Sequence, residues 1–141
     1  MKRSPLWLAA MCLFLVGAVR AALPPAAAME VNYLLKQVES SGCEFYRNGS
    51  WYDAAHAMAH LRVKFDYLVA KNMIATAEDF IDKAASMSSL SGKVYRVKFP
   101  GGAEIESGQW LRSVLERYRA ANGAAAGRVW RIVMTGATAL A

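Results

Sequence analysis

An Asn-Gly pair between aromatic residues is the feature that most restricts how this chain folds. The segment is Phe45-Tyr46-Arg47-Asn48-Gly49-Ser50-Trp51-Tyr52. A two-residue type I′ turn requires positive φ at both central positions, and Asn-Gly is a strongly preferred pair for it. The sequence therefore predicts a β-hairpin over residues 45–52. Asn48-Gly49-Ser50 is also a glycosylation sequon, but the turn explains the same residues without it.

Helical spacing of apolar residues predicts four helices around this hairpin. We expect them at about residues 30–40, 54–72, 76–86 and 108–119. Asp53 immediately precedes the longest of them and is a suitable N-cap, since its carboxylate accepts from a free backbone N–H. Thr76 precedes the third helix in a pattern that resembles a capping box.

The rest of the chain predicts a short sheet and a single α+β domain. Residues 94–99 alternate in the period-two pattern of a half-buried strand, and Pro100-Gly101-Gly102 turns the chain after them. With 141 residues and 55% hydrophobic composition, the chain is long and apolar enough for one folded domain. We therefore expect about four helices packed on a short antiparallel sheet that contains the hairpin. The expected core includes Leu61, Phe65, Phe80 and Trp110.

Two segments without a clear secondary-structure pattern flank the predicted domain at residues 30–119. Residues 22–29, around Pro24-Pro25, are expected to be a short spacer. Residues 120–141 begin with small residues, which favours a tail. The alternative is that Val129-Trp130-Arg131-Ile132-Val133-Met134 forms an edge strand.

The N-terminus predicts export. Lys2 and Arg3 form a charged region, and the apolar stretch Leu6–Val19 follows it. Small residues then supply candidate cleavage sites near residue 21 or residue 28, which completes the pattern of a signal peptide over residues 1–21. The apolar stretch is shorter than the ~20 residues that cross a bilayer, although an uncleaved anchor stays open. We expect a periplasmic or secreted protein without stable membrane insertion after cleavage.

The charge distribution argues against nucleic acid as a partner. The formal net charge is +6, from 17 basic and 11 acidic residues. Residues 30–119 hold twelve of the basic residues and all eleven acids, so the predicted domain carries 12 − 11 = +1. A protein that binds the phosphate backbone concentrates positive charge in its folded domain.

The chain carries few patterns that indicate chemistry. Phosphate-binding loops, Gly-x-Ser-x-Gly elbows and Cys-x-x-Cys pairs are absent from the sequence. His56 and His60 lie four apart on the predicted helix, a spacing that presents two imidazoles to one metal ion, and Cys43 or Asp53 would complete the site. A Cys43–His60 catalytic pair lacks an obvious third group to orient it. Ordinary structural histidines are the alternative that we favour, and we expect no cofactor.

Four segments in order resemble the YfeK-like proteins, a family of small exported bacterial proteins with a domain of unknown function. These segments are Phe45-Tyr46-Arg47-Asn48-Gly49, His60-Leu61-Arg62-Val63-Lys64, Ala77-Glu78-Asp79-Phe80-Ile81-Asp82-Lys83 and Ser91-Gly92-Lys93-Val94-Tyr95. The resemblance covers residues 30–119 and implies the periplasm of a Gram-negative bacterium. It implies no activity, cofactor or catalytic residue.

The same segments suggest a candidate cluster that offers several donors to a carboxylate or another anion. Its members are Arg47, Asn48, His60, Lys64, Ser91 and Lys93. These groups also have the chemistry to satisfy one another and pin the hairpin to the long helix, which is the interpretation we favour. The sequence therefore predicts a non-catalytic binding or interaction module for a periplasmic protein or a small anionic ligand. A metal-binding protein using His56 and His60 is the alternative, and an enzyme comes third.

Overall fold

A computed structural model describes residues 22–137, with side chains up to Arg131. The predicted signal peptide at residues 1–21 lies outside the described residues, as does Cys12.

The described residues form four α-helices, one π-helical turn and a four-stranded sheet. The helices are α1 (Pro25–Ser40), α2 (Ala54–Ala70), α3 (Ala77–Phe80) and α4 (Ser107–Ala137), and the π-helical turn η1 (Ile81–Ala85) continues α3. The strands are β1 (Glu44–Arg47), β2 (Ser50–Asp53), β3 (Arg96–Lys98) and β4 (Glu104–Glu106). This arrangement confirms the predicted α+β class with four helices and a short antiparallel sheet.

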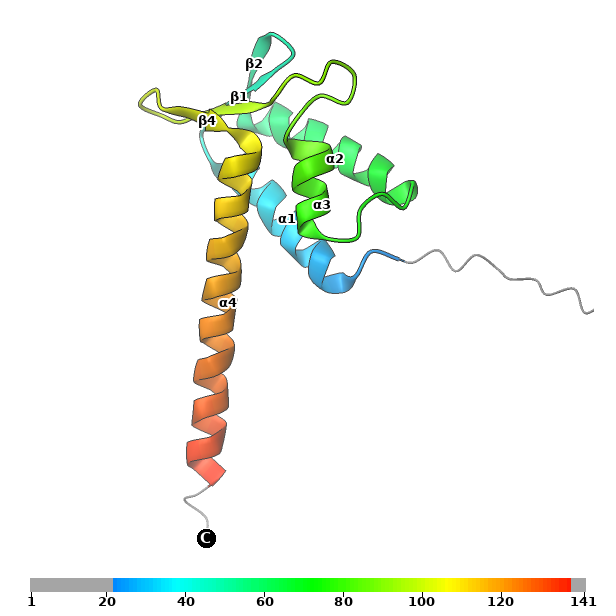
Figure 1. Cartoon of the computed structure of the whole chain (residues 1–141). Helices are drawn as coiled ribbons and strands as arrows, with labels where there is room; N and C mark the ends of the chain where they lie inside the picture. The colour runs from blue at the N-terminus through cyan, green and yellow to red at the C-terminus, as the bar shows by residue number, and fades with distance from the viewer. Residues whose placement is uncertain (1–21, 138–141) are drawn as a thin grey trace, which may run out of the picture.

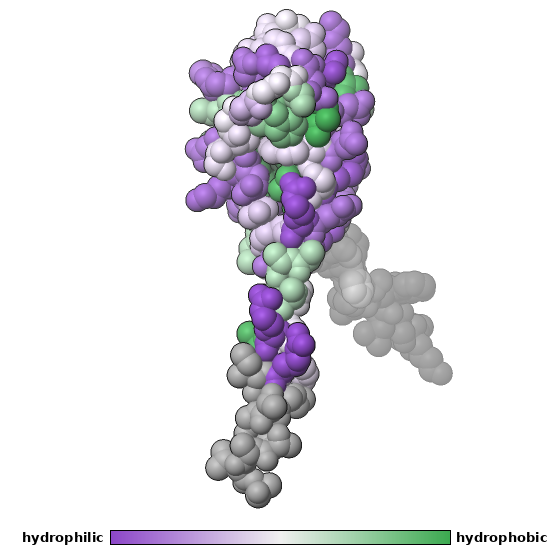
Figure 2. All heavy atoms as spheres, turned by 90° about the vertical axis from the view of Figure 1, so that its left-hand side faces the viewer, coloured by the Kyte–Doolittle hydropathy of each residue, from purple (hydrophilic) through white to green (hydrophobic). Residues whose placement is uncertain are grey.

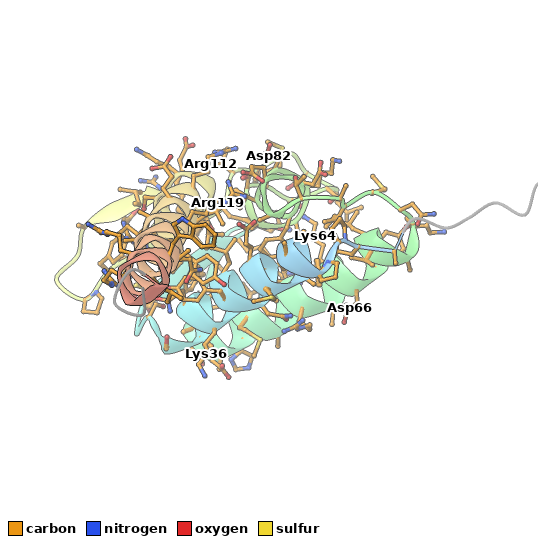
Figure 3. The ribbon with its side chains drawn as sticks, turned by 90° about the horizontal axis from the view of Figure 1, so that it is seen from below. Lys36, Lys64, Asp66, Asp82, Arg112 and Arg119 are labelled. Atoms are coloured by element: carbon orange, nitrogen blue, oxygen red, sulfur yellow. The ribbon has the colours of Figure 1, made fainter. Side chains whose placement is uncertain are left out.

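The sheet lies at one end of the molecule and the helices lie beneath it (Figure 1). Its strand order is β2-β1-β3-β4, and every neighbouring pair is antiparallel. Helix α1 packs against α2, α3 and α4, and α4 also packs against η1, where Arg112 pairs with Asp82 (Figure 3). Helix α4 then continues well beyond the other helices (Figure 1).

The predicted hairpin is confirmed. Strands β1 and β2 pair from Glu44↔Asp53 to Arg47↔Ser50, which leaves a two-residue turn. Asn48 has φ 51° and Gly49 has φ 100°, the positive values that the Asn-Gly pair predicts.

Both predicted helix caps are also confirmed. The Asp53 carboxylate accepts a hydrogen bond from the His56 backbone N–H at 2.8 Å, at the start of α2. The Thr76 hydroxyl accepts from the Asp79 backbone N–H at 3.1 Å, at the start of α3. Each bond satisfies a backbone donor that the first helical turn leaves free.

The four predicted core residues are all buried, and they join several elements. Phe65 of α2 meets Phe80 of α3 edge-on, with ring centroids 5.6 Å apart. Trp110 of α4 packs against Phe45 of β1 at 5.8 Å. Leu61 belongs to the same core cluster, and so do the fully buried leucines of α1. The core thus holds the hairpin, α2 and the first turns of α4 in one place.

Two predictions at the ends of the domain are wrong. Helix α1 begins at Pro25, so much of the expected spacer is helical. Proline is well suited to a first helical turn, and Ala26–Ala28 have the highest helix propensity. Helix α4 extends to Ala137, so the expected end at Arg119 and the alternative edge strand are both wrong. Alanine-rich sequence favours helix there, and no described strand lies alongside to pair with an extended segment.

The second half of the sheet differs in detail from the prediction. Only Arg96–Lys98 of the expected strand over residues 94–99 pairs regularly, because its partners are short: β1 has four residues and β4 has three. Strand β4 was not predicted. Three residues are too few for an alternating pattern to emerge, so only its pairing with β3 defines it.

Candidate functional site

A cavity of about 40 Å³ lies between the hairpin and helix α2. The residues around it that bear polar or aromatic groups include Arg47, Tyr52, His56, His60, Tyr95 and Ser107. Strand β1 positions Arg47 at its end, directly before the Asn-Gly turn, and α2 positions the two histidines one helical turn apart. Two members of the predicted cluster, Arg47 and His60, therefore meet at this cavity.

Arg47 contacts His60 directly. Its Nη1 lies 3.0 Å from Nδ1 and 3.2 Å from Nε2 of the imidazole. A guanidinium has donors only, so the imidazole nitrogen in this hydrogen bond must be the acceptor. The contact therefore requires an unprotonated nitrogen on His60. The Arg47 guanidinium also lies over the Tyr52 ring, with Cζ 5.0 Å from the centroid.

The electrostatics of the cluster favour the neutral imidazole. Burial lowers the pKa of His60 below its usual 6.5, and the charges of Arg47 and Lys64 lower that pKa further. Each of these causes penalises the imidazolium. Burial, followed by the charges of Arg47 and Lys64, therefore favours a neutral His60, which can accept the hydrogen bond from Arg47.

Lys64 lies one turn further along α2 and connects that helix to η1 and to the residues that follow η1. Its Nζ donates to the carbonyl oxygens of Ala84 at 3.0 Å and Met87 at 2.8 Å. Nζ also lies 5.3 Å from the centroid of the Tyr95 ring. Burial lowers the pKa of Lys64, and the charge of Arg47 adds to this effect.

Two of the remaining cluster residues, Asn48 and Ser91, connect the hairpin turn to the loop between η1 and β3. The Ser91 hydroxyl donates to Asn48 Oδ1 at 2.7 Å. Lys93 is exposed, and its ammonium makes no hydrogen bond or ion pair with residues 22–137. The structure thus brings Arg47, His60 and Lys64 together, joins Asn48 to Ser91, and leaves Lys93 at the periphery.

The cluster has an excess of positive charge. Arg47 and Lys64 each lower the pKa of His60, and neither forms an ion pair with an acid in the described part of the chain. Burial also raises the pKa of the neighbouring Tyr95 phenol, while Arg47 and Ser88 act against that rise. Cations that lack a carboxylate partner are suited to receiving an anion.

Comparison with known proteins places the chain in a family. Residues 25–119 match the family of unknown function DUF5329, well over half of the sequence. The chain belongs to this family. The DUF5329 region contains every residue of the candidate cluster, whereas residues 120–137 of α4 follow it.

A curated relative confirms the resemblance to the YfeK-like proteins. The uncharacterized protein YfeK of Salmonella typhimurium strain LT2 is 42% identical over 66 residues, which cover 46% of this chain and 53% of the relative. The chain thus spans about half the length of the curated relative it matches. No solved structure matches the chain.

The metal site considered from the sequence is not assembled in the described part of this DUF5329 protein. His56 is exposed and its Nδ1 lies 2.9 Å from the carboxylate of Asp53. Cys43 is buried, and its thiol donates to the Ser41 carbonyl oxygen at 3.6 Å. No group of three His, Cys, Asp or Glu residues within residues 22–137 is placed to hold a metal ion.

The residues at the cavity that were not among the predicted site residues include Tyr52, Tyr95 and Ser107. Tyr95, Val97 and Phe99 are two residues apart in sequence and so belong to the same face of the expected strand. Val97 is fully buried. The alternation along residues 94–99 therefore carried a signal that Tyr95 faces inward. Ser107 starts α4 and is joined to Tyr95 by a backbone hydrogen bond of 2.9 Å. That hydrogen bond connects segments that are distant in sequence, so the position of Ser107 could not be predicted from a local sequence pattern.

Proposed function

We propose that this protein is an exported, non-catalytic binding module that receives the anionic end of a small ligand at the Arg47–His60 cavity. One observation carries the proposal: Arg47 reaches the cavity with a neutral imidazole as its hydrogen-bond partner and no carboxylate among the described residues. A carboxylate entering the cavity gains a charge-assisted hydrogen bond from the guanidinium.

The size of the cavity limits what enters it. A volume of about 40 Å³ has room for roughly three water-sized groups. That is enough for a carboxylate but not for a whole metabolite. We therefore propose that the ligand inserts its anionic end and keeps its remaining atoms outside the cavity.

The absence of a reaction in this proposal follows from the groups at the site. Nucleophilic catalysis needs a nucleophile within hydrogen-bond reach of a base. Tyr52, Tyr95 and Ser107 bring hydroxyls to the cavity, but among the described residues His60 is hydrogen-bonded only to Arg47. The Cys43 thiol is hydrogen-bonded to a neighbouring backbone carbonyl. Binding is the simpler use of this arrangement.

Titration of His60 by NMR in the presence of sodium acetate tests the proposal. A carboxylate beside His60 stabilises the imidazolium, so we expect acetate to raise the pKa of His60. Acetamide at the same concentration and ionic strength has the same shape without the charge, and it should leave that pKa unchanged.

Two arginine variants provide matched controls for the acetate experiment. Arg47→Gln should abolish the effect of acetate. Arg62→Gln should retain it, because Arg62 lies on α2 with His60 but away from the cavity. An equal response to acetate and acetamide, or a full acetate response in Arg47→Gln, would refute binding at this cavity.

Export is the second part of the proposal, and it rests on the charged and apolar N-terminus. A mature chain that begins near Ala22 would keep α1 whole, because α1 starts at Pro25. We expect the intact mass of the exported protein to correspond to that start. Recovery of the full-length mass from the membrane fraction would show an uncleaved anchor instead.

A further inference from the structure

The C-terminal part of helix α4 leaves the body of the protein without packing against it. The buried side chains in the described part of this helix are Ser107, Trp110, Leu111, Val114 and Leu115, all near its start. Every side chain from Arg119 to Arg131 is exposed. Figure 1 shows the helix projecting away from the sheet, and Figure 2 shows it emerging alone below the body. We call residues 120–137 the α4 extension.

The α4 extension exposes large apolar side chains. Val129 is 62% exposed and Trp130 is 65% exposed. Gly123 and Gly127 lower its intrinsic helix propensity, and no tertiary contact of the described residues compensates for them. An apolar environment that covers Val129 and Trp130 would therefore stabilise the helix as well as bury them.

Charge and helical geometry together make this segment amphipathic. Residues 120–141 contain two basic residues, Arg128 and Arg131, and no acid. At 3.6 residues per turn these arginines lie about 60° apart on one side of the helix. Val129 and Trp130 lie on the opposite side. Figure 2 shows strongly hydrophilic side chains on the α4 extension close to apolar ones.

We infer that the α4 extension binds the surface of an anionic phospholipid bilayer. Basic residues on one side and Val or Trp on the other are the pattern of a helix that lies in the membrane interface. Tryptophan favours the headgroup level, and arginine is attracted to anionic lipid phosphates. No helix of the described residues is long and apolar enough to cross a bilayer. The extension therefore lies along the surface, in line with the expectation of no stable insertion.

A bilayer explains the charges better than a second copy of the chain. Two such extensions that pair side by side in parallel bring the arginines of both copies close together. An anionic surface attracts the same arginines. The extension also lies at the opposite end of the molecule from the hairpin and its cavity (Figure 1), so lipid binding leaves the cavity accessible.

Vesicle sedimentation tests the inference with protein purified after export. We expect the protein to bind vesicles of phosphatidylglycerol at least about tenfold more tightly than vesicles of phosphatidylcholine, and more weakly as salt is raised. All variants share one N-terminus, so any contribution from that end is common to them. Equal binding to both lipids would overturn the inference.

Three variants locate the binding surface. Arg128→Glu with Arg131→Glu should weaken binding to phosphatidylglycerol at least about tenfold, and Trp130→Ser should weaken it severalfold. Lys36→Glu with Lys71→Glu makes the same change in net charge at exposed sites elsewhere and should bind as the unaltered protein does. Unchanged binding by the arginine variant would overturn the inference, as would an equal loss in the lysine variant. A dimer in sedimentation equilibrium that Trp130→Ser dissociates, without vesicle binding, would instead assign the surface to a second copy.

Discussion

Arg47 organises the candidate site at the scale of single residues. Its guanidinium contacts the imidazole of His60, lies over Tyr52 and lowers the pKa of both His60 and Lys64. A guanidinium stays protonated and offers only hydrogen-bond donors, so a group that is hydrogen-bonded to it must act as an acceptor. His60 acts as that acceptor in its neutral form, and its lowered pKa makes the stability of the protein depend on pH.

The protein should lose stability as the pH falls through the range in which unfolded histidine takes up a proton. The pKa of His60 is lowered by folding, so the unfolded chain binds more protons than the native state between that pKa and about 6.5. The stabilisation is complete above about pH 6.5 and is lost progressively below it. We expect a lower melting temperature at about pH 5 than at about pH 7.5.

Two histidine variants separate this effect from other titrations. His60→Gln cannot take up the proton and should show a shallower loss of melting temperature over the same range. His56→Gln removes an exposed imidazole outside the Arg47 contact and should keep the original dependence. A pH dependence that is identical in all three proteins would contradict the role given to His60.

Lys64 should contribute mainly to stability. Lys64→Met retains an unbranched chain of similar length but leaves the carbonyl oxygens of Ala84 and Met87 without their donor. Loss of a hydrogen-bond partner costs about 1–3 kcal/mol when the remaining group is buried. Since Lys64 is only half-buried, we expect about 1 kcal/mol, or ~4–8 °C in a thermal melt. Lys71→Met, at the exposed end of α2, is the control, and an equal effect of both variants would contradict this role.

The hairpin is the element that brings Arg47 to the cavity. Strand β1 pairs with β2 on one side and β3 on the other, so its register fixes Phe45 in the core and Arg47 two residues later on the same face. A shift of one residue would turn Arg47 away from α2. The turn at Asn48-Gly49 thus determines the geometry of the site.

Substitution of the turn glycine should test this dependence. A Cβ at Gly49 meets no other atom within 4 Å, so any destabilisation comes from the backbone, whose φ is 100°. Gly49→Val should lower stability by at least about 1–2 kcal/mol, because a β-branched residue is strained at positive φ. Ser50→Val, in the adjacent extended strand, should be nearly neutral in the same thermal melt. Equal melting temperatures for Gly49→Val and the unaltered protein would show that the turn does not control the fold.

Helix caps and turns could be predicted because their chemistry is local, while the length of α4 could not. Asp53, Thr76 and the Asn-Gly pair each act on a backbone group within a few residues. The continuation of α4 beyond Arg119 depends on alanine propensity opposed by Gly123 and Gly127, with no packing to decide between helix and coil. The β-branched residues near Val129 favoured a strand, but a strand requires a partner that the sheet does not supply.

At the scale of the whole molecule, the contacts that join distant segments could not be predicted from the sequence. Arg119 of α4 donates to both carboxylate oxygens of Glu30 on α1, at 2.7 and 2.8 Å, and to Glu78 on α3 at 2.6 Å. These two carboxylates raise the pKa of Arg119. Figure 3 shows Arg119 on α4 where the helices come together. Nothing in the spacing of residues 30, 78 and 119 predicts this three-helix junction, just as nothing local predicted Tyr95 beside His60.

The junction at Arg119 also marks where α4 ceases to contribute to the folded body. A chain that ends at Ala121 keeps Arg119 and every residue described as buried in α4, but loses all of the α4 extension after its first two residues. No side chain from Asn122 to Arg131 is buried, so the loss of these residues removes little packing, and surface changes of this kind are usually within about 0.5 kcal/mol. We therefore expect a melting temperature within about 4 °C of the full-length protein.

Arg119→Gln in the shortened chain should lower the melting temperature further, because the carboxylates of Glu30 and Glu78 both lose their partner. A much larger loss on deleting residues 122–141 alone would mean that the extension packs against the body in solution.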